Sequence, residues 1–154
     1  MPKVEIHDSN IRAKLTALGK LAEGGDALKT IVGDMGSTAR DLIRARTAAG
    51  KSIDGDVFAP YSKGYLKKRK DRGLGSTPNL SFTGKMMTAL RWRREGKSGI
   101  RLGFENATDR TKAEYNHYGT GHAKARPFFG LNDQDRKSIV KVINARIREI
   151  LGKS

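Results

Sequence analysis

The feature that most constrains the fold is a pair of alternating segments on either side of a glycine-rich turn. Residues 90–95 read Leu-Arg-Trp-Arg-Arg-Glu, residues 96–99 read Gly-Lys-Ser-Gly, and residues 100–104 read Ile-Arg-Leu-Gly-Phe. Alternation with a period of two on both sides of a tight turn is typical of a β-hairpin. We therefore predict a hairpin over residues 90–104. Its apolar side chains share one face, which we expect the second and last helices to cover: Leu90, Trp92, Ile100, Leu102 and Phe104.

Apolar residues at helical spacing predict two helices ahead of this hairpin, over residues 9–22 and 26–50. Separated by a pair of glycines, they predict an N-terminal antiparallel helical hairpin. Gly33 and Gly36 lie inside the second helix, where a glycine costs up to about 1 kcal/mol relative to alanine. They indicate either a close helix contact or a local weakness.

Three further helices are expected. Ser62 can cap a short helix that runs towards Arg72, a polar helix spans residues 108–118, and Asn132 can cap a C-terminal helix. The fold class is therefore α+β. The helical hairpin and the C-terminal helix pack on a small antiparallel sheet that contains the β-hairpin. We expect one domain over residues 1–154, with mobile loops near 49–62 and 73–80 that become ordered against neighbouring molecules.

Composition excludes several classes of protein. The chain has no cysteine, and therefore neither disulfides nor thiolate metal sites. Its start, Met-Pro-Lys-Val-Glu-Ile, is not a signal peptide, and no apolar run is long enough to cross a bilayer. We expect a protein made in the cytoplasm that does not enter a membrane. The hydrophobic fraction is only 36%, so neighbours in an oligomer are expected to supply part of the stability.

The formal net charge is +15, and it is concentrated in the middle of the chain. Between residues 61 and 103 there are twelve basic and two acidic residues. Such a charge needs an anionic partner, which can be nucleic acid, an acidic protein surface or an anionic membrane. The residues that we expect to face an assembly partner or DNA are Lys67, Lys68, Arg69, Lys70, Arg91 and Arg93.

Reactive groups do not form a recognisable catalytic pattern. His117 and His122 flank Tyr-Gly-Thr-Gly, which lacks the further ligands of a metal site and the Gly-Lys-Ser/Thr ending of a phosphate-binding loop. His117 is expected to pack at a helix end and His122 to lie in a turn. We therefore predict a protein that is not an enzyme, with no catalytic residues, no metal and no cofactor.

Four segments, in order, resemble the phage virion-morphogenesis family, also called tail-completion proteins. They are Phe-Ala-Pro-Tyr-Ser at 58–62, Leu-Ser-Phe-Thr-Gly-Lys-Met at 80–86, Tyr-Asn-His-Tyr-Gly at 115–119 and Ala-Arg-Pro-Phe-Phe-Gly-Leu at 125–131. The last segment is the most specific of the four. In the third, the spacing from tyrosine to glycine is shorter than in the family, which leaves His117 without an assigned role.

The resemblance implies a structural protein of the virion neck or tail end, made in the host cytoplasm. It implies a homo-oligomeric, hexameric ring that contacts head-completion or stopper proteins and tail-terminator or tail-tube proteins, with possible non-specific contact to packaged DNA and none to a membrane. The candidate structural anchors are Trp92, Arg126, Pro127, Phe128 and Phe129. We expect Phe128 or Phe129 in the core, and Arg126 on a carboxylate of this chain or of a neighbouring subunit.

Two other functions fit parts of the sequence. A basic DNA-binding module shares the charge and the aromatic residues of the middle segment, but it predicts a recognition helix with base-reading side chains. Here the basic residues fall on a loop, a short helix and the hairpin. A nuclease is the third class, and metal-dependent cleavage of DNA would identify it.

Overall fold

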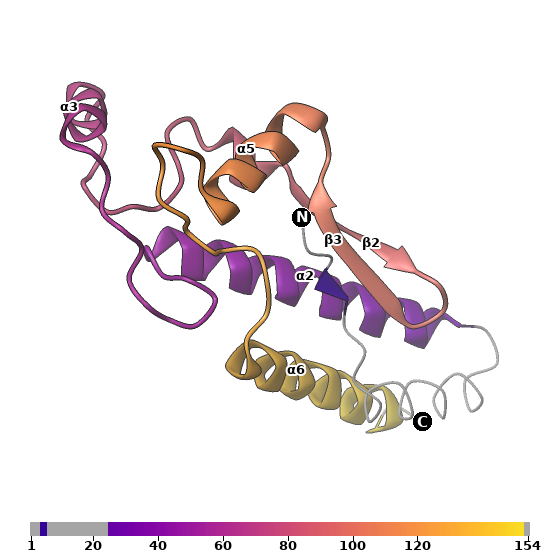
Figure 1. The fold of residues 1–154 in the computed structure, drawn as a ribbon. Helices are drawn as coiled ribbons and strands as arrows, with labels where there is room; N and C mark the ends of the chain where they lie inside the picture. The colour runs from indigo at the N-terminus through magenta and orange to yellow at the C-terminus, as the bar shows by residue number, and fades with distance from the viewer. Residues whose placement is uncertain (1–3, 6–24, 153–154) are drawn as a thin grey trace. The chain divides into compact units, whose positions relative to one another are not determined.

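The computed structural model describes residues 4–5 and 25–152 (Figure 1). Along the chain its elements are β1 (Val4–Glu5), α2 (Asp26–Ala48), α3 (Lys63–Asp71), α4 (Lys85–Thr88), β2 (Leu90–Glu95), β3 (Gly99–Phe104), α5 (Ala107–Tyr118) and α6 (Asp133–Gly152). This is the predicted α+β fold. The first helix of the predicted helical hairpin, over residues 9–22, lies outside the described residues.

The contacts within the chain gather into two compact units. The first contains residues 43–91 and 104–130, and the second contains residues 25–42, 92–103 and 131–152 together with β1. The segments of the two units are interleaved in the sequence, so that α2 and the hairpin contribute residues to both.

The sheet has three strands in the order β1-β3-β2. The hairpin of β2 and β3 was predicted, whereas β1 was not. β1 pairs with β3 in antiparallel orientation, with Val4 opposite Leu102 and Glu5 opposite Arg101. Two residues are too short to show an alternation, which explains why the third strand has no signature in the sequence.

Burial along the hairpin follows the predicted alternation. The side chains of Leu90, Ile100, Leu102 and Phe104 are buried, and Trp92 is half-buried on the same face. The intervening arginines of both strands are exposed. The predicted apolar face is therefore confirmed.

In the second unit, Trp92 packs on the glycines of α2. A Cβ atom added to Gly36 would lie 2.3 Å from Cδ2 of the indole ring, whereas one added to Gly33 would lie 3.9 Å from Cη2. Gly36 is therefore needed for close contact, although its neighbour is Trp92 of strand β2 and not another helix. The same unit contains α6, where the guanidinium of Arg146 donates to Asp34 of α2 over 2.6 Å.

In the first unit, phenylalanine rings form the centre of the core. Phe128 and Phe129 are both buried, with ring centroids 6.3 and 5.6 Å from that of Phe104. The prediction that this pair includes a core residue is confirmed for both members. Arg46 of α2 donates to the carbonyl oxygens of Phe128 and Gly130 at 3.1 and 2.6 Å, which holds the segment in place.

Helix caps occur where the sequence indicates them. The Ser62 hydroxyl accepts the backbone N–H of Tyr65 at the start of α3. At the start of α6 the side chain of Asn132 accepts from the N–H of Asp135, and the Asp135 carboxylate accepts from the N–H of Asn132. This reciprocal pair satisfies backbone donors that a helix leaves free at its first turn.

The loop that precedes α3 contains a hydrogen-bonded turn. The N–H of Ser52 donates to the carbonyl of Asp56 over 2.8 Å, and the N–H of Phe58 donates to the carbonyl of Gly50 over 2.8 Å. The N–H of Ile53 reaches the carbonyl of Pro127. The loop is therefore tied both to itself and to the 125–131 segment, and its mobility stays a prediction.

Candidate functional site

Arg126 is the buried charge around which the candidate site is built. Only 6% of this residue is exposed. Its Nε donates to the carbonyl of Ala59 over 2.9 Å, and its Nη2 donates to the carbonyl of Pro60 over 3.0 Å. Arg126 thus holds the segment ahead of α3 in place, although the two are far apart in the sequence. The expected intramolecular carboxylate partner is corrected to backbone carbonyls, which lie in one irregular segment and have no partner in a helix or sheet.

Tyr61 lies against two guanidinium groups. The Cζ atom of Arg126 lies 4.8 Å from the centroid of its ring, and that of Arg69 lies 5.1 Å from it. Both distances fall within the range of cation–π attraction. The phenolic oxygen accepts the backbone N–H of Leu80 over 2.9 Å. Burial raises the pKa of Tyr61 above its ordinary value, although the hydrogen bond from Leu80 and the positive charge of Arg69 act in the opposite direction.

The sequence suggested that Arg69 is a solvated basic residue. In the structure, only 1% of this residue is exposed. Its guanidinium donates to the carbonyls of Gly75 and Ser81 at 2.8 and 2.7 Å, and to Oδ1 of Asn79 at 3.2 Å. The planar fork of an arginine can hold several carbonyls at once, which a lysine cannot. Arg69 therefore ties residues 75–81 to α3, and its assignment to the partner-facing surface was wrong.

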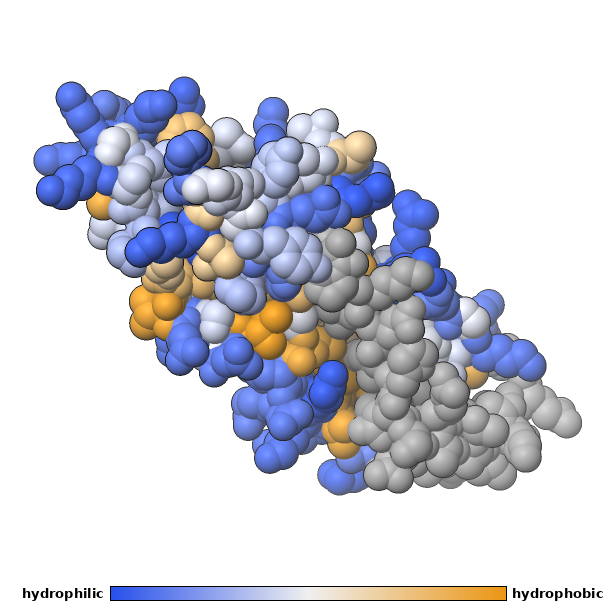
Figure 2. Space-filling view, in the orientation of Figure 1, coloured by the Kyte–Doolittle hydropathy of each residue, from blue (hydrophilic) through white to orange (hydrophobic). Residues whose placement is uncertain are grey.

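The helical spacing of residues in α3 indicates that Arg69 is internal. Tyr65 and Leu66 lie four and three residues before it, and therefore on the same side of α3. Both are partly buried, whereas Lys67, Lys68 and Lys70 are exposed. Figure 2 shows hydrophilic side chains gathered over α3 at the upper left of the view. Three of the four predicted basic residues of this helix thus lie on its surface.

The remaining predicted basic residues lie elsewhere. Arg91 on β2 is exposed and forms an ion pair of 3.1 Å with Glu105. Arg93 is exposed on the same strand, in the second unit. Arg91 and Arg93 thus lie on strand β2, whereas the predicted lysines lie on helix α3.

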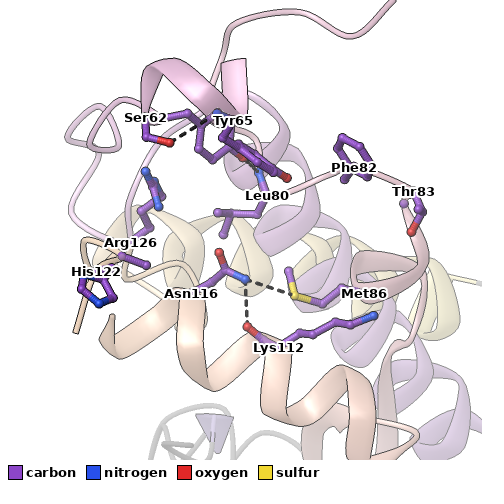
Figure 3. A pocket seen from close by; sticks show the side chains of 13 residues that line it. Ser62, Tyr65, Leu80, Phe82, Thr83, Met86, Lys112, Asn116, His122 and Arg126 are labelled. Carbon is purple, nitrogen blue, oxygen red and sulfur yellow. Dashed lines mark hydrogen bonds between the residues drawn. The ribbon is translucent and has the colours of Figure 1, made fainter. Parts of the chain in front are cut away.

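A pocket of about 540 Å³ opens beside the arginines (Figure 3). In Figure 3, Arg126 and His122 lie on one side, Phe82 and Thr83 on the other, and Lys112 and Asn116 along α5. The described residues that line it belong to the first unit: Tyr61, Ser62, Tyr65, Leu80, Phe82, Thr83, Gly84, Met86, Lys112, Asn116, His122, Ala123 and Arg126. Its volume lies within the range of ligand-binding pockets.

Each of the four family-like segments contributes to this pocket. Tyr61 comes from the first, Leu80 from the second, Asn116 from the third and Arg126 from the fourth. The sequence indicated these segments separately, and the fold brings them to one place. Lys112 and His122 also line the pocket, yet neither was predicted to belong to a site, because nothing in the local sequence connects them to the other segments.

One wall of the pocket is aromatic. The ring of Tyr65 lies edge-on to Tyr61, with centroids 4.7 Å apart, and 5.8 Å from Phe82. The guanidinium of Arg72 lies over the ring of Phe82, with its Cζ atom 5.1 Å from the ring centroid. Aromatic walls of this kind bind apolar side chains with large contact areas.

The charge of the pocket is positive. Arg126 and Lys112 are among its lining residues, and none of the described residues that line it is acidic. The amide of Asn116 donates to the carbonyl of Lys112 over 2.8 Å, which orients its oxygen away from the helix backbone. The arrangement can therefore bind a group that combines an anionic end with apolar surface.

His117 performs a structural task next to this pocket. Its side chain is buried at the end of α5, and its Nδ1 accepts the backbone N–H of Phe129 over 3.3 Å. Burial lowers the pKa of His117 below its ordinary value. The predicted position at a helix end is confirmed. Within the described ranges 4–5 and 25–152, histidine and acidic side chains do not gather into a group of three that could hold a metal ion.

Comparison with known proteins identifies a family for this chain. No curated protein and no solved structure matches the chain significantly. Of the helices that the structure describes, none has the length and apolar character needed to span a membrane. The sequence model of one family, however, aligns with residues 9–148, which include all four family-like segments and the whole pocket. The chain therefore belongs to the phage virion morphogenesis family.

Proposed function

We propose that this protein is a structural component of the phage neck or tail end, where its copies close into a hexameric ring that completes the tail or joins it to the head. Membership of the virion morphogenesis family indicates a structural role in virion assembly rather than a catalytic one. The proposed partners are head-completion or stopper proteins on one side and tail-terminator or tail-tube proteins on the other.

The observation that carries the proposal is the convergence of the four family-like segments on one pocket. An assembly protein needs preformed surfaces that recognise its neighbours, and rigid surfaces lose little conformational entropy on binding. Arg126 and Tyr61 hold three of these segments together through the carbonyls of Ala59 and Pro60 and the N–H of Leu80. The pocket is therefore part of the fixed fold of the first unit.

The basic surface of α3 supports contact with an anionic neighbour. Lys67, Lys68 and Lys70 are exposed, and they can face an acidic ring or the phosphates of DNA in the channel. The DNA-binding alternative loses part of its basis. Arg69 and Arg126 are occupied inside the fold, and the exposed lysines lie on a helix of nine residues.

The experiment that tests the proposal is complementation of particles made without this protein. Electron microscopy of such lysates is expected to show full heads and separate tails, with tails of irregular length or unfinished ends. Adding the purified protein is expected to restore joined, infectious particles. Normal numbers of infectious virions in its absence would overturn the proposal.

A further inference from the structure

The buried charge of the pocket, Arg126, has no counter-ion among the residues that the structure describes. Arg126 donates three of the five N–H groups of a guanidinium, to the carbonyls of Ala59, Pro60 and Lys124. No carboxylate of the described residues forms an ion pair with it. Carbonyls satisfy hydrogen bonds but carry no net charge, so an arriving carboxylate would find a desolvated guanidinium with donors to spare.

A second surface of the same unit has the opposite character. Residues 51–57 form a loop that exposes the carboxylates of Asp54 and Asp56 and, next to them, the side chain of Val57. Val57 is 77% exposed, the largest value among the large apolar residues that the structure describes as exposed. Figure 2 shows hydrophobic atoms where this loop lies. Neither aspartate forms an ion pair within the described part of the chain.

The loop is already shaped for insertion. Its turn is closed by bonds from the N–H of Ser52 to the carbonyl of Asp56 and from the N–H of Gly55 to the carbonyl of Ser52, at 2.8 and 3.0 Å. A β-bridge between Lys51 and Val57 joins its two ends. Gly55 has a φ of +89°, which side chains rarely adopt. A loop ordered in this way loses little entropy when it binds.

We propose that the 51–57 loop of one copy inserts into the pocket of the next copy, with the carboxylates of Asp54 and Asp56 near Arg126 and Lys112 and with Val57 against the aromatic wall. The inference rests on the proposed ring and specifies the contact that closes it. A ring built by rotation needs two different, complementary surfaces on every subunit. Loop and pocket share no residue, so that each copy can donate one and accept the other.

The contact also addresses the charge of the assembly. Copies that each have a formal charge of +15 repel one another. When the loop with its two aspartates enters the positive pocket, two neighbouring copies attract each other at that position. In other orientations the two copies still repel each other. Such pairing selects the register of neighbours more than it adds to overall affinity.

Cross-linking tests the contact directly, because the chain has no cysteine of its own. Particles are assembled from equal amounts of two variants, Asp56→Cys and His122→Cys, both at exposed positions, and are then oxidised with copper–phenanthroline. The mixture is expected to give a covalent dimer, whereas either variant alone gives none. A mixture of Asp56→Cys with Lys67→Cys is the matched control, since Lys67 lies on the exposed face of α3 and does not line the pocket.

Two results separate this inference from the proposed function. If both variants enter particles at the parent level and the first mixture gives no dimer, loop insertion is wrong although the protein remains a virion component. If the unmodified protein itself is absent from particles, the proposed function and the inference both fail.

A charge exchange provides the second test and does not depend on cysteine geometry. The double variant Asp54→Lys and Asp56→Lys is expected to lower incorporation into particles at least tenfold, while circular dichroism shows a parent-like fold. Adding Lys112→Glu and His122→Glu to the same chain is expected to restore a substantial part of the incorporation. Unchanged incorporation of the first variant, or no restoration by the second, would overturn loop insertion.

Discussion

The indole ring of Trp92 lies directly on Gly36 of α2, so close that an added Cβ atom would be 2.3 Å from Cδ2 of the ring. The contact explains why a helix with otherwise continuous apolar periodicity contains a glycine at this point. It also places the only tryptophan of the chain between the hairpin and the helix of the second unit.

Substitution of the two helix glycines is expected to have opposite effects. Gly36→Ala forces the indole to move and should lower the free energy of unfolding by about 1–3 kcal/mol. Gly33→Ala meets Trp92 only at 3.9 Å, so it should gain about 0.5–1 kcal/mol from helix propensity. Urea unfolding followed by tryptophan fluorescence measures both variants. Equal effects of the two substitutions would show that Trp92 does not determine the glycine at position 36.

Arg69 should be essential to the fold although it lies among surface lysines. Arg69→Lys removes the fork that holds Gly75 and Ser81, and it should destabilise the protein by about 2–3 kcal/mol. The neighbouring Lys68→Met, at an exposed position, should change stability by less than about 0.5 kcal/mol. Chemical unfolding at neutral pH compares the two. Parent-like stability of Arg69→Lys would mean that these hydrogen bonds do not stabilise the fold.

His117 should make stability depend on pH. Burial lowers its pKa in the folded protein below the ordinary value of 6.5, so the unfolded chain binds the proton more readily. Its stabilising contribution is therefore complete above about pH 6.5 and decreases as the pH falls from there towards the folded pKa. Thermal unfolding between pH 7.5 and 5 should show this decrease in the parent and in His122→Gln, and a weaker one in His117→Gln. An identical profile in all three proteins would contradict the assignment.

The exposed lysines of α3 should act in assembly and not in folding. The triple variant Lys67→Glu, Lys68→Glu and Lys70→Glu keeps Arg69 and should melt close to the parent. It should nevertheless yield heads and tails that do not join, as seen by electron microscopy. The parent should bind naked DNA weakly, without sequence preference and with steep dependence on salt. Normal joining by the variant would refute the role of this surface, and sequence-specific DNA binding would favour the DNA-binding alternative.

Local patterns predicted most of the elements. Alternation identified the hairpin, and capping residues such as Ser62 and Asn132 marked the helix starts. These signals are local because hydrogen bonds and side-chain periodicity within a single element generate them. The burial of Phe128 or Phe129 was predicted in the same way, because an apolar run directly ahead of a capped helix is expected to pack in the core.

The pocket could not be predicted because it depends on contacts between distant segments. Arg126 reaches Ala59 across 67 positions of the sequence, and no pattern in the residues around Arg126 indicates that it binds these carbonyls. Arg69 was accordingly counted with the surface lysines, and Arg126 was assigned a carboxylate partner in place of backbone carbonyls. The structure divides them into internal arginines such as Arg69 and exposed lysines such as Lys67.

The most direct test of the central proposal is the number of copies of this protein in purified virions, measured by quantitative mass spectrometry against a head or tail protein of known copy number. A closed ring at the neck or tail end predicts a fixed value of about six copies per particle, which should be the same in full virions and in completed tails. Absence from purified virions, or an amount that varies between preparations, would contradict a structural role in the virion.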